Sequence, residues 1–317
     1  MALFAAALLV SFAATPMGFP DGLEMLEANA ANAEQFVSDI RAYHNAELAA
    51  MALLQAELAN TENRPTPERA KNIREELALR ATRLGNVYMV ALNHFPNNAR
   101  LHNYYGELLY DTLGDSAEAI KQWNQALAND DDCDLAMNNL ALHFIHVGRY
   151  DIGIKYMDEA LKRDKKNPDY LFNMVQIYMV HFPEVEKLRK WKRSKVYKEA
   201  MKLSSQAVKY APDDYDLLQD YAMNFFAAEN FGEDPDWDDA AKAWEAARAK
   251  AHRQDETFNC WLNEGRVRLR NDDFSGAVRC LEEAVKLMPN SQIANELLHK
   301  AQEFATSHPE KGRKSKK

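Results

Sequence analysis

Large apolar residues and small residues recur at helical spacing along most of the chain. The clearest stretch is residues 259–290 (NCWLNEGRVRLRNDDFSGAVRCLEEAVKLMPN), which falls within a unit of about 34 residues. Its large residues are Trp261, Phe274 and Leu281, its small residues are Gly265, Ala277 and Ala284, and Pro289 stands near its end. Small residues let two helices approach closely, large residues fill the gap between them and the next unit, and proline ends the second helix. The stretch therefore predicts a pair of antiparallel helices.

The same pattern recurs upstream. Its matching residues are Gly106, Ala119, Trp123 and Ala126; Leu140, Ala141, Phe144, Gly148, Tyr150, Gly153, Met157 and Ala160; Ala200, Ala207 and Pro212; and Tyr215, Ala222, Trp237, Ala240, Trp244 and Ala247. Tyr88, Ala91 and Pro96 match the end of a degenerate earlier unit. Thr66 can cap the second helix of that unit, and Pro67 suits its first helical position.

Matched position by position, this pattern resembles the tetratricopeptide repeat (TPR) over about Pro96 to Phe304. The resemblance implies an all-α fold, a right-handed α-solenoid of stacked antiparallel helix pairs. N-terminal helices, including the degenerate repeat, are expected at 21–95 and about five repeats at 96–306. Insertions near 181–194 and 229–236 should map to loops, and the segment after Ser291 predicts a C-terminal capping helix.

In this family the first helices of successive repeats line a concave groove that binds peptides. By register, the resemblance places these residues in the groove: Asn103, Tyr110, Asn138, Leu142, Tyr170, Asn173, Ile177, Gln219, Met223, Phe226 and Arg266. The row of Asn103, Asn138 and Asn173 could donate to and accept from the backbone of an extended peptide. Because Asn is common at this place in the repeat, a merely solvated row is the alternative.

The two ends of the chain differ from the repeats. Residues 1–14 (MALFAAALLVSFAA) form an apolar run interrupted only by Ser11, although no Lys or Arg precedes Arg41. We expect residues 1–20 to be a signal peptide of an exported or periplasmic protein. The alternative is a short buried or frayed N-terminal helix in a cytoplasmic protein. Residues 307–317 predict a basic flexible tail.

Composition narrows the class of protein. Gly 11 and Pro 11 leave few residues that break helices, which argues against a turn-rich β fold. The net charge of −9 argues against general nucleic-acid binding, and no apolar run reaches the roughly 18 residues that span a bilayer. With only Cys 3, the chain has no disulfide framework. Cys260 and Cys280 are expected to fill the core, with a disulfide between them as the alternative.

No segment carries the pattern of a phosphate loop, a serine nucleophile elbow, a zinc-protease helix or a Cys-x-x-Cys pair. The acidic run 229–239 (ENFGEDPDWDD) alternates Asp234, Asp236 and Asp238 as a calcium loop does, but Asp239 stands where that loop requires glycine. Acids at that place also favour the N-terminus of a helix without any metal. We therefore expect no enzymatic activity, no cofactor and no metal.

A basic run of the opposite charge spans residues 186–198 (EKLRKWKRSKVYK). We predict a basic docking patch at Lys187, Arg189, Lys190, Lys192 and Arg193, and Lys195 and Lys198 extend the run. Three interpretations are open: a solvated helix face, a contact with the acidic insertion of the next repeat, or a dock for an anionic lipid or an acidic protein.

Together these features predict a non-catalytic scaffold or adaptor that acts in protein–protein interaction by binding a protein or peptide in its concave groove. The alternative is a structural or assembly protein that self-associates through the charged insertions or the N-terminal helices.

Overall fold

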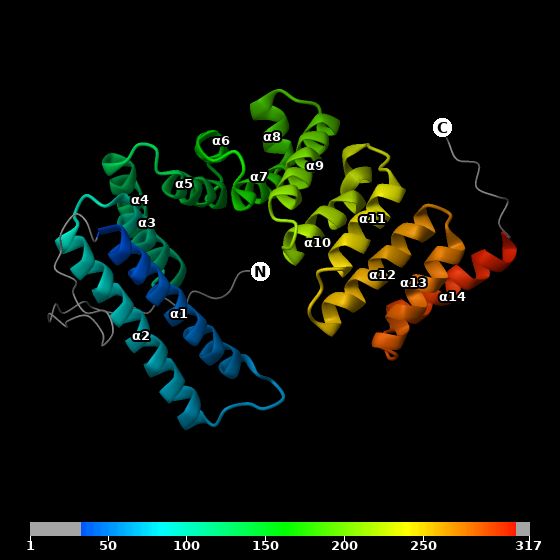
Figure 1. Ribbon diagram of the computed structural model, residues 1–317, viewed down its shortest axis with the longest axis horizontal. Coiled ribbons are helices and arrows are strands. Elements are labelled where there is room, and N and C mark those ends of the chain that lie inside the picture. Colours follow the sequence, from blue (N-terminus) through cyan, green and yellow to red (C-terminus); the bar gives the residue numbers. More distant parts are fainter. Residues whose placement is uncertain (1–32, 309–317) are drawn as a thin grey trace. The chain divides into compact units, whose positions relative to one another are not determined.

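The computed structural model describes residues 33–308 (Figure 1). In that part of the chain there are fourteen α-helices and no strand, which confirms the predicted all-α class. The predicted signal peptide, and all but the first two residues of the predicted tail, lie outside the described residues. The helices form two compact units that divide after Arg163.

The first unit holds three helix pairs. Its elements are α1 (Ala33–Ala59), α2 (Pro67–His94), α3 (Ala99–Glu107), the π-helical turn η1 (Leu108–Thr112), α4 (Ser116–Asn129), α5 (Asp134–His146) and α6 (Tyr150–Arg163). Consecutive helices pack as α1 with α2, α3 with α4 and α5 with α6. The described part of the predicted N-terminal helical region is therefore the hairpin of α1 and α2.

The second unit holds three further pairs and an end helix. Its elements are α7 (Pro168–Val180), α8 (Phe182–Arg189), α9 (Arg193–Tyr210), α10 (Tyr215–Asn224), the 3-10 helix η2 (Phe225–Phe231), α11 (Trp237–Arg248), α12 (Gln254–Arg270), α13 (Phe274–Leu287) and α14 (Gln292–Ser307). The pairs are α7 with α9, α10 with α11 and α12 with α13, and α14 packs on α13. The short helix α8 lies within the predicted insertion at 181–194.

Polar caps begin most helices where the sequence pattern starts a new one. Thr66 accepts a hydrogen bond from the Arg69 amide, and Pro67 takes the first helical position of α2, as predicted. Ser291 caps α14, whose Ala294 and Ala301 are fully buried against the last pair. These caps satisfy backbone amides that have no partner inside the helix, and so they set where each helix begins.

The small residues of the repeat lie where the paired helices touch. The alanines at equivalent places of the second helices are all buried. Ala207 is 2% exposed, and the others are 0% exposed: Ala119, Ala126, Ala160, Ala200, Ala240, Ala247, Ala277 and Ala284. Gly106 is a sharper case, because a Cβ built on it would lie 2.4 Å from Nε1 of Trp123. The Trp123 indole closes this gap and donates its N–H to the Asn103 carbonyl at 3.3 Å. Side-chain size at these positions therefore sets the distance between α3 and α4.

Gly106→Ala tests this constraint. The added methyl gains about 1 kcal/mol of helix propensity, but overpacking against the indole costs about 1–3 kcal/mol, so the variant should unfold at lower denaturant concentration. In a Trp123→Leu background the same change should be neutral or stabilising, because the obstacle is gone. Urea unfolding of the four proteins measures the coupling, and an equal loss in both backgrounds would contradict the account.

A buried histidine joins α1 to α2. The His44 ring is 1% exposed, and its Nδ1 lies 2.5 Å from the Tyr88 hydroxyl. Burial, followed by the positive charge of Arg41, lowers the pKa of His44 from 6.5 to about 4. The folded protein therefore keeps this ring neutral at pH values where the unfolded chain protonates it.

The pH dependence of stability follows from that pKa. The contribution of His44 is present in full above pH 6.5 and is lost as the pH falls toward 4, with a limit of about 3 kcal/mol. Urea unfolding at pH 7.5 and pH 5 should show a larger acid loss in the native protein than in a His44→Gln variant. Equal losses in the two proteins would show that His44 does not titrate in this way.

Candidate functional site

The first helices of the second unit form a continuous row. The Gln176 amide on α7 donates to Asp220 on α10 at 2.8 Å, and Arg266 on α12 lies over the Phe226 ring of η2 at 4.7 Å. We call the side of this row formed by α10, η2 and α12 the first-helix face. Exposed Met223, 42% accessible, lies on it beside partly exposed Gln219.

Arg266 on α12 is half-buried and has an amide partner but no described acidic one. Its Nη1 donates to the Asn263 side-chain oxygen at 2.7 Å, and no described carboxylate forms an ion pair with it. Burial and then the charge of Arg270 lower the pKa of Arg266 below its usual value. The guanidinium has therefore lost water without gaining an opposite charge, which leaves it ready for an anionic group.

Arg270 differs from Arg266 because it is already paired. Its Nη1 donates to Glu229 at 2.7 Å, and its guanidinium lies 5.1 Å from the Trp237 ring centre. The Phe226 ring lies near both arginines, with Arg266 at 4.7 Å and Arg270 at 5.7 Å from its ring centre. Cation–π contacts hold both guanidinium groups on aromatic rings of the neighbouring pair.

Three predicted groove residues serve the core instead. Asn103, Tyr170 and Ile177 are 0%, 3% and 2% exposed. In this structure their side chains are therefore not accessible to a partner. The other predicted residues keep some exposure; Leu142 and Met223 are exposed, and Tyr110, Asn138, Asn173, Gln219, Phe226 and Arg266 are partly exposed. The predicted carboxamide row therefore lacks its first member at the surface.

The Asn103 amide is used inside the first unit. Its Nδ2 donates to Glu107 at 2.8 Å, and its Oδ1 accepts from Asn139 of α5 at 2.9 Å. Arg41 of α1 binds the other Glu107 oxygen at 2.6 Å. This network links α1, α3 and α5, and sequence reasoning missed it. The one local signal was the four-residue spacing of Asn103 and Glu107, which places both on one helix face.

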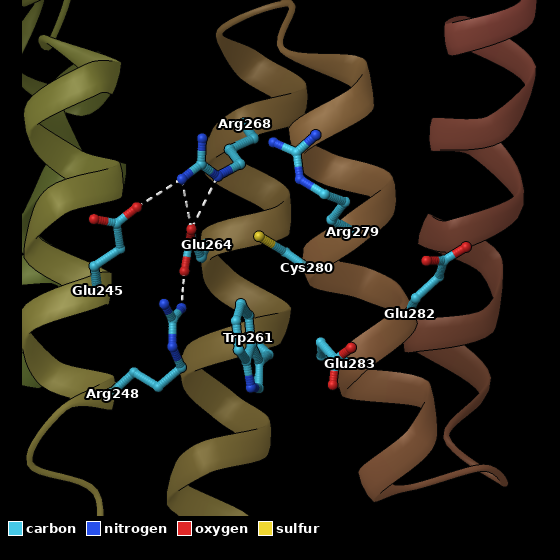
Figure 2. A pocket seen from close by; sticks show the side chains of 9 residues that line it. All are labelled: Glu245, Arg248, Trp261, Glu264, Arg268, Arg279, Cys280, Glu282 and Glu283. Carbon is cyan, nitrogen blue, oxygen red and sulfur yellow. Dashed lines mark hydrogen bonds and ion pairs between the residues drawn. The ribbon is translucent and has the colours of Figure 1, made fainter.

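A pocket of about 420 Å³ opens on α11, α12 and α13 (Figure 2). Its lining residues are Glu245, Arg248, Trp261, Glu264, Arg268, Arg279, Cys280, Glu282 and Glu283. None of them is a predicted groove residue. In Figure 2, Glu264 lies between the guanidinium groups of Arg248 and Arg268.

Glu264 anchors the charge network of this pocket. Its carboxylate is 1% exposed, accepts from Arg248, and also accepts from Arg268 at 2.7 and 2.9 Å. Arg268 also forms ion pairs with Glu245 at 2.7 Å and with Asp273 at 2.8 Å. Burial alone would lower the pKa of Arg268, but the hydrogen bonds from its guanidinium to Asp273 and Glu264 raise it overall. The inner wall thus consists of charges that satisfy one another and tie α11 to α12.

The cysteines are free and buried, as predicted for Cys260 and Cys280. Burial raises the pKa of the Cys280 thiol to about 12 and that of Cys260 to about 11, so neither is a nucleophile at neutral pH. In the described residues, no three His, Cys, Asp or Glu side chains come together to hold a metal ion. Among the helices from α1 to α14, none is both long and apolar enough to cross a membrane.

The acidic insertion caps a helix. Oδ1 of Asp236 accepts from the backbone amides of Asp238 and Asp239 at 2.9 and 3.1 Å, at the beginning of α11. The acidic run therefore serves as the N-terminal cap of α11, as the helix-terminus interpretation predicts. The predicted basic docking patch lies at the end of α8 and the beginning of α9.

Comparison with known proteins gives a family for part of the chain and a fold for most of it. A family model described as a tetratricopeptide repeat matches residues 108–168. The C-terminal part of a TPR repeat-containing protein from Cytophaga hutchinsonii is 17% identical, with a TM-score of 0.53 over 84% of this chain and 98% of that one. The pilF protein of Pseudomonas aeruginosa is 15% identical, with a TM-score of 0.48 over 81% and 98%. No curated protein sequence matches the chain.

Glu264→Gln should destabilise the second unit. The change keeps the shape of the side chain but leaves Arg248 and Arg268 without their shared charge, and breaking a buried ion pair in this way costs about 3–5 kcal/mol. Glu282→Gln, at an exposed lining position of the same pocket, should change the free energy of unfolding by less than about 0.5 kcal/mol. If urea unfolding gave equal effects, the network would not hold the helices together.

Proposed function

We propose that this tetratricopeptide-repeat protein is a non-catalytic adaptor that binds an extended segment of a protein partner across its first-helix face. The repeat fold itself suggests a scaffold for protein–protein interaction. The partner would lie on α10, η2 and α12 of the second unit. On the sequence pattern of residues 1–20 alone, we place this activity outside the cytoplasm.

The half-buried and acid-free Arg266 guanidinium carries the proposal. A guanidinium that is already desolvated loses little more water on binding, and a carboxylate can accept two parallel hydrogen bonds from it. We therefore infer that the partner presents an Asp or Glu side chain, or a terminal carboxylate, to Arg266. The Phe226 ring contacts the cation at 4.7 Å, and this contact would hold the guanidinium in position before the partner binds.

Apolar contact would come from Met223. Its side chain is exposed on α10, and a methionine can adapt its shape to different partner side chains. Gln219 lies one helical turn before it and can donate to and accept from a peptide backbone. The face thus combines a fixed cation, an adaptable apolar group and a carboxamide.

Self-association through the N-terminal hairpin is a second candidate function. Leu53 of α1 and Leu79 of α2 are 75% and 52% exposed, although both are large and apolar. Self-association through this hairpin would remove both side chains from water. A concentration-dependent mass in solution, lost in a Leu53→Glu variant, would favour this function over the adaptor.

Arg266→Gln tests the adaptor. Partners captured from native extract by the full chain should be lost with this variant and kept with Arg279→Gln, an exposed arginine on α13. For a peptide of the captured partner, we expect titration calorimetry to show binding about ten- to a hundredfold weaker. Folding should not suffer, because the change relieves repulsion with Arg270. Unchanged capture by Arg266→Gln would exclude Arg266 from the binding site.

A further inference from the structure

A second charged surface lies on the same unit, at the turn between α8 and α9 (Figure 1). Residues 187–198 (KLRKWKRSKVYK) contain no acid, in a chain whose net charge is −9. We call this segment the basic corner; its cations are Lys187, Arg189, Lys190, Lys192, Arg193, Lys195 and Lys198. Six of the seven are exposed, and Arg189 is half-buried. The corner is a concentrated positive surface on an otherwise acidic protein.

Two cations of the basic corner form ion pairs within the protein. Arg193 pairs with Glu186 at 3.6 Å, and Lys198 pairs with Glu233 of the acidic insertion at 3.0 Å. The second contact joins the basic run 186–198 to the acidic insertion near 229–236, which is one of the three interpretations open from the sequence. The remaining lysines have no ion pair with any described carboxylate: Lys187, Lys190, Lys192 and Lys195. Most of the positive charge of the corner is therefore not neutralised by ion pairs within the protein.

Aromatic rings hold the corner in shape. Arg193 lies over Phe182 at 4.5 Å, Lys195 lies over Trp191 at 4.7 Å, and the Arg189 guanidinium donates to the Tyr178 hydroxyl at 3.2 Å. Lys190 ends α8 in the left-handed conformation, with φ 54°. Glycine adopts this conformation at the least cost in backbone strain. The turn nevertheless has a lysine at this position.

Apolar side chains accompany the lysines. Leu188, between Lys187 and Arg189, is 43% exposed, and the Trp191 indole is partly exposed at the turn. A surface that combines lysines with an exposed leucine and a tryptophan is typical of the interface of a lipid bilayer, where the indole lies at the headgroups. The segment 187–198 itself contains no carboxylate, and those that pair with its cations belong to Glu186 and Glu233.

We propose that the basic corner docks the protein on the surface of a bilayer that contains anionic phospholipid. Its acid-free cations are all lysines, which are compact charges suited to a fluid layer of headgroups. Recognition of particular carboxylates on an acidic protein would favour free arginines, and both arginines here are already engaged with aromatic rings. The negative charge of the remaining chain would orient the molecule with this corner toward the membrane.

Vesicle co-sedimentation tests the proposal with the full chain. Vesicles of phosphatidylcholine with about a third phosphatidylglycerol should bind the protein, vesicles of phosphatidylcholine alone should not, and salt should weaken binding. Lys187→Gln/Lys190→Gln/Lys192→Gln should weaken binding about a hundredfold, at about fivefold per lysine. The matched control is Lys121→Gln/Lys162→Gln/Lys286→Gln, which removes three exposed lysines elsewhere and should retain binding within about threefold.

Three further measurements test the proposal against its alternatives. Neutralising the five cations of residues 309–317 should leave binding in place, whereas loss of binding in that variant alone would assign docking to the tail and overturn the proposal. Binding to soluble polyglutamate without binding to anionic vesicles would point to an acidic protein instead. Arg266→Gln should bind vesicles normally, so failure of the adaptor function and failure of membrane docking are distinguishable.

Discussion

The close approach of paired helices at alanine and glycine positions is the constraint on which the rest of the structure depends. Ala126, Ala160 and Ala284 are fully buried at equivalent places, and Gly106 leaves room for the Trp123 ring. Interiors packed this tightly do not tolerate an extra methyl group without strain. Because each pair is fixed in this way, the outer sides of the helices are free to carry other chemistry.

The polar networks between neighbouring pairs follow from that arrangement. Glu264 joins α11 to α12 through two arginines, and Asn103 joins α3 to α5. Such buried polar groups are tolerated because every member has a partner. Arg266 on the first-helix face differs from them, because its hydrogen-bond partner is the neutral Asn263 and no described acid balances its partly desolvated charge.

The sequence predicted the fold, whereas the groove residues stay a prediction, three of which the structure buries. Positions such as Trp261, Gly265 and Leu281 indicate a helix pair, because side-chain size at a fixed spacing determines how two helices pack. Burial of Tyr170 and Ile177 was not predicted, because an error of one residue turns a side chain by about 100° around the helix, from groove to core. Contacts such as Arg248 with Glu264 join separate helices, and no local pattern specifies them.

Site-specific photo-crosslinking tests most directly the claim that a partner binds the first-helix face. A benzophenone amino acid in place of exposed Met223 on α10 should cross-link the partner in native extract. The same amino acid in place of exposed Arg279 on α13 should not. Cross-linking from position 279 but not from position 223 would contradict the account and move the binding surface to the second helices of the pairs.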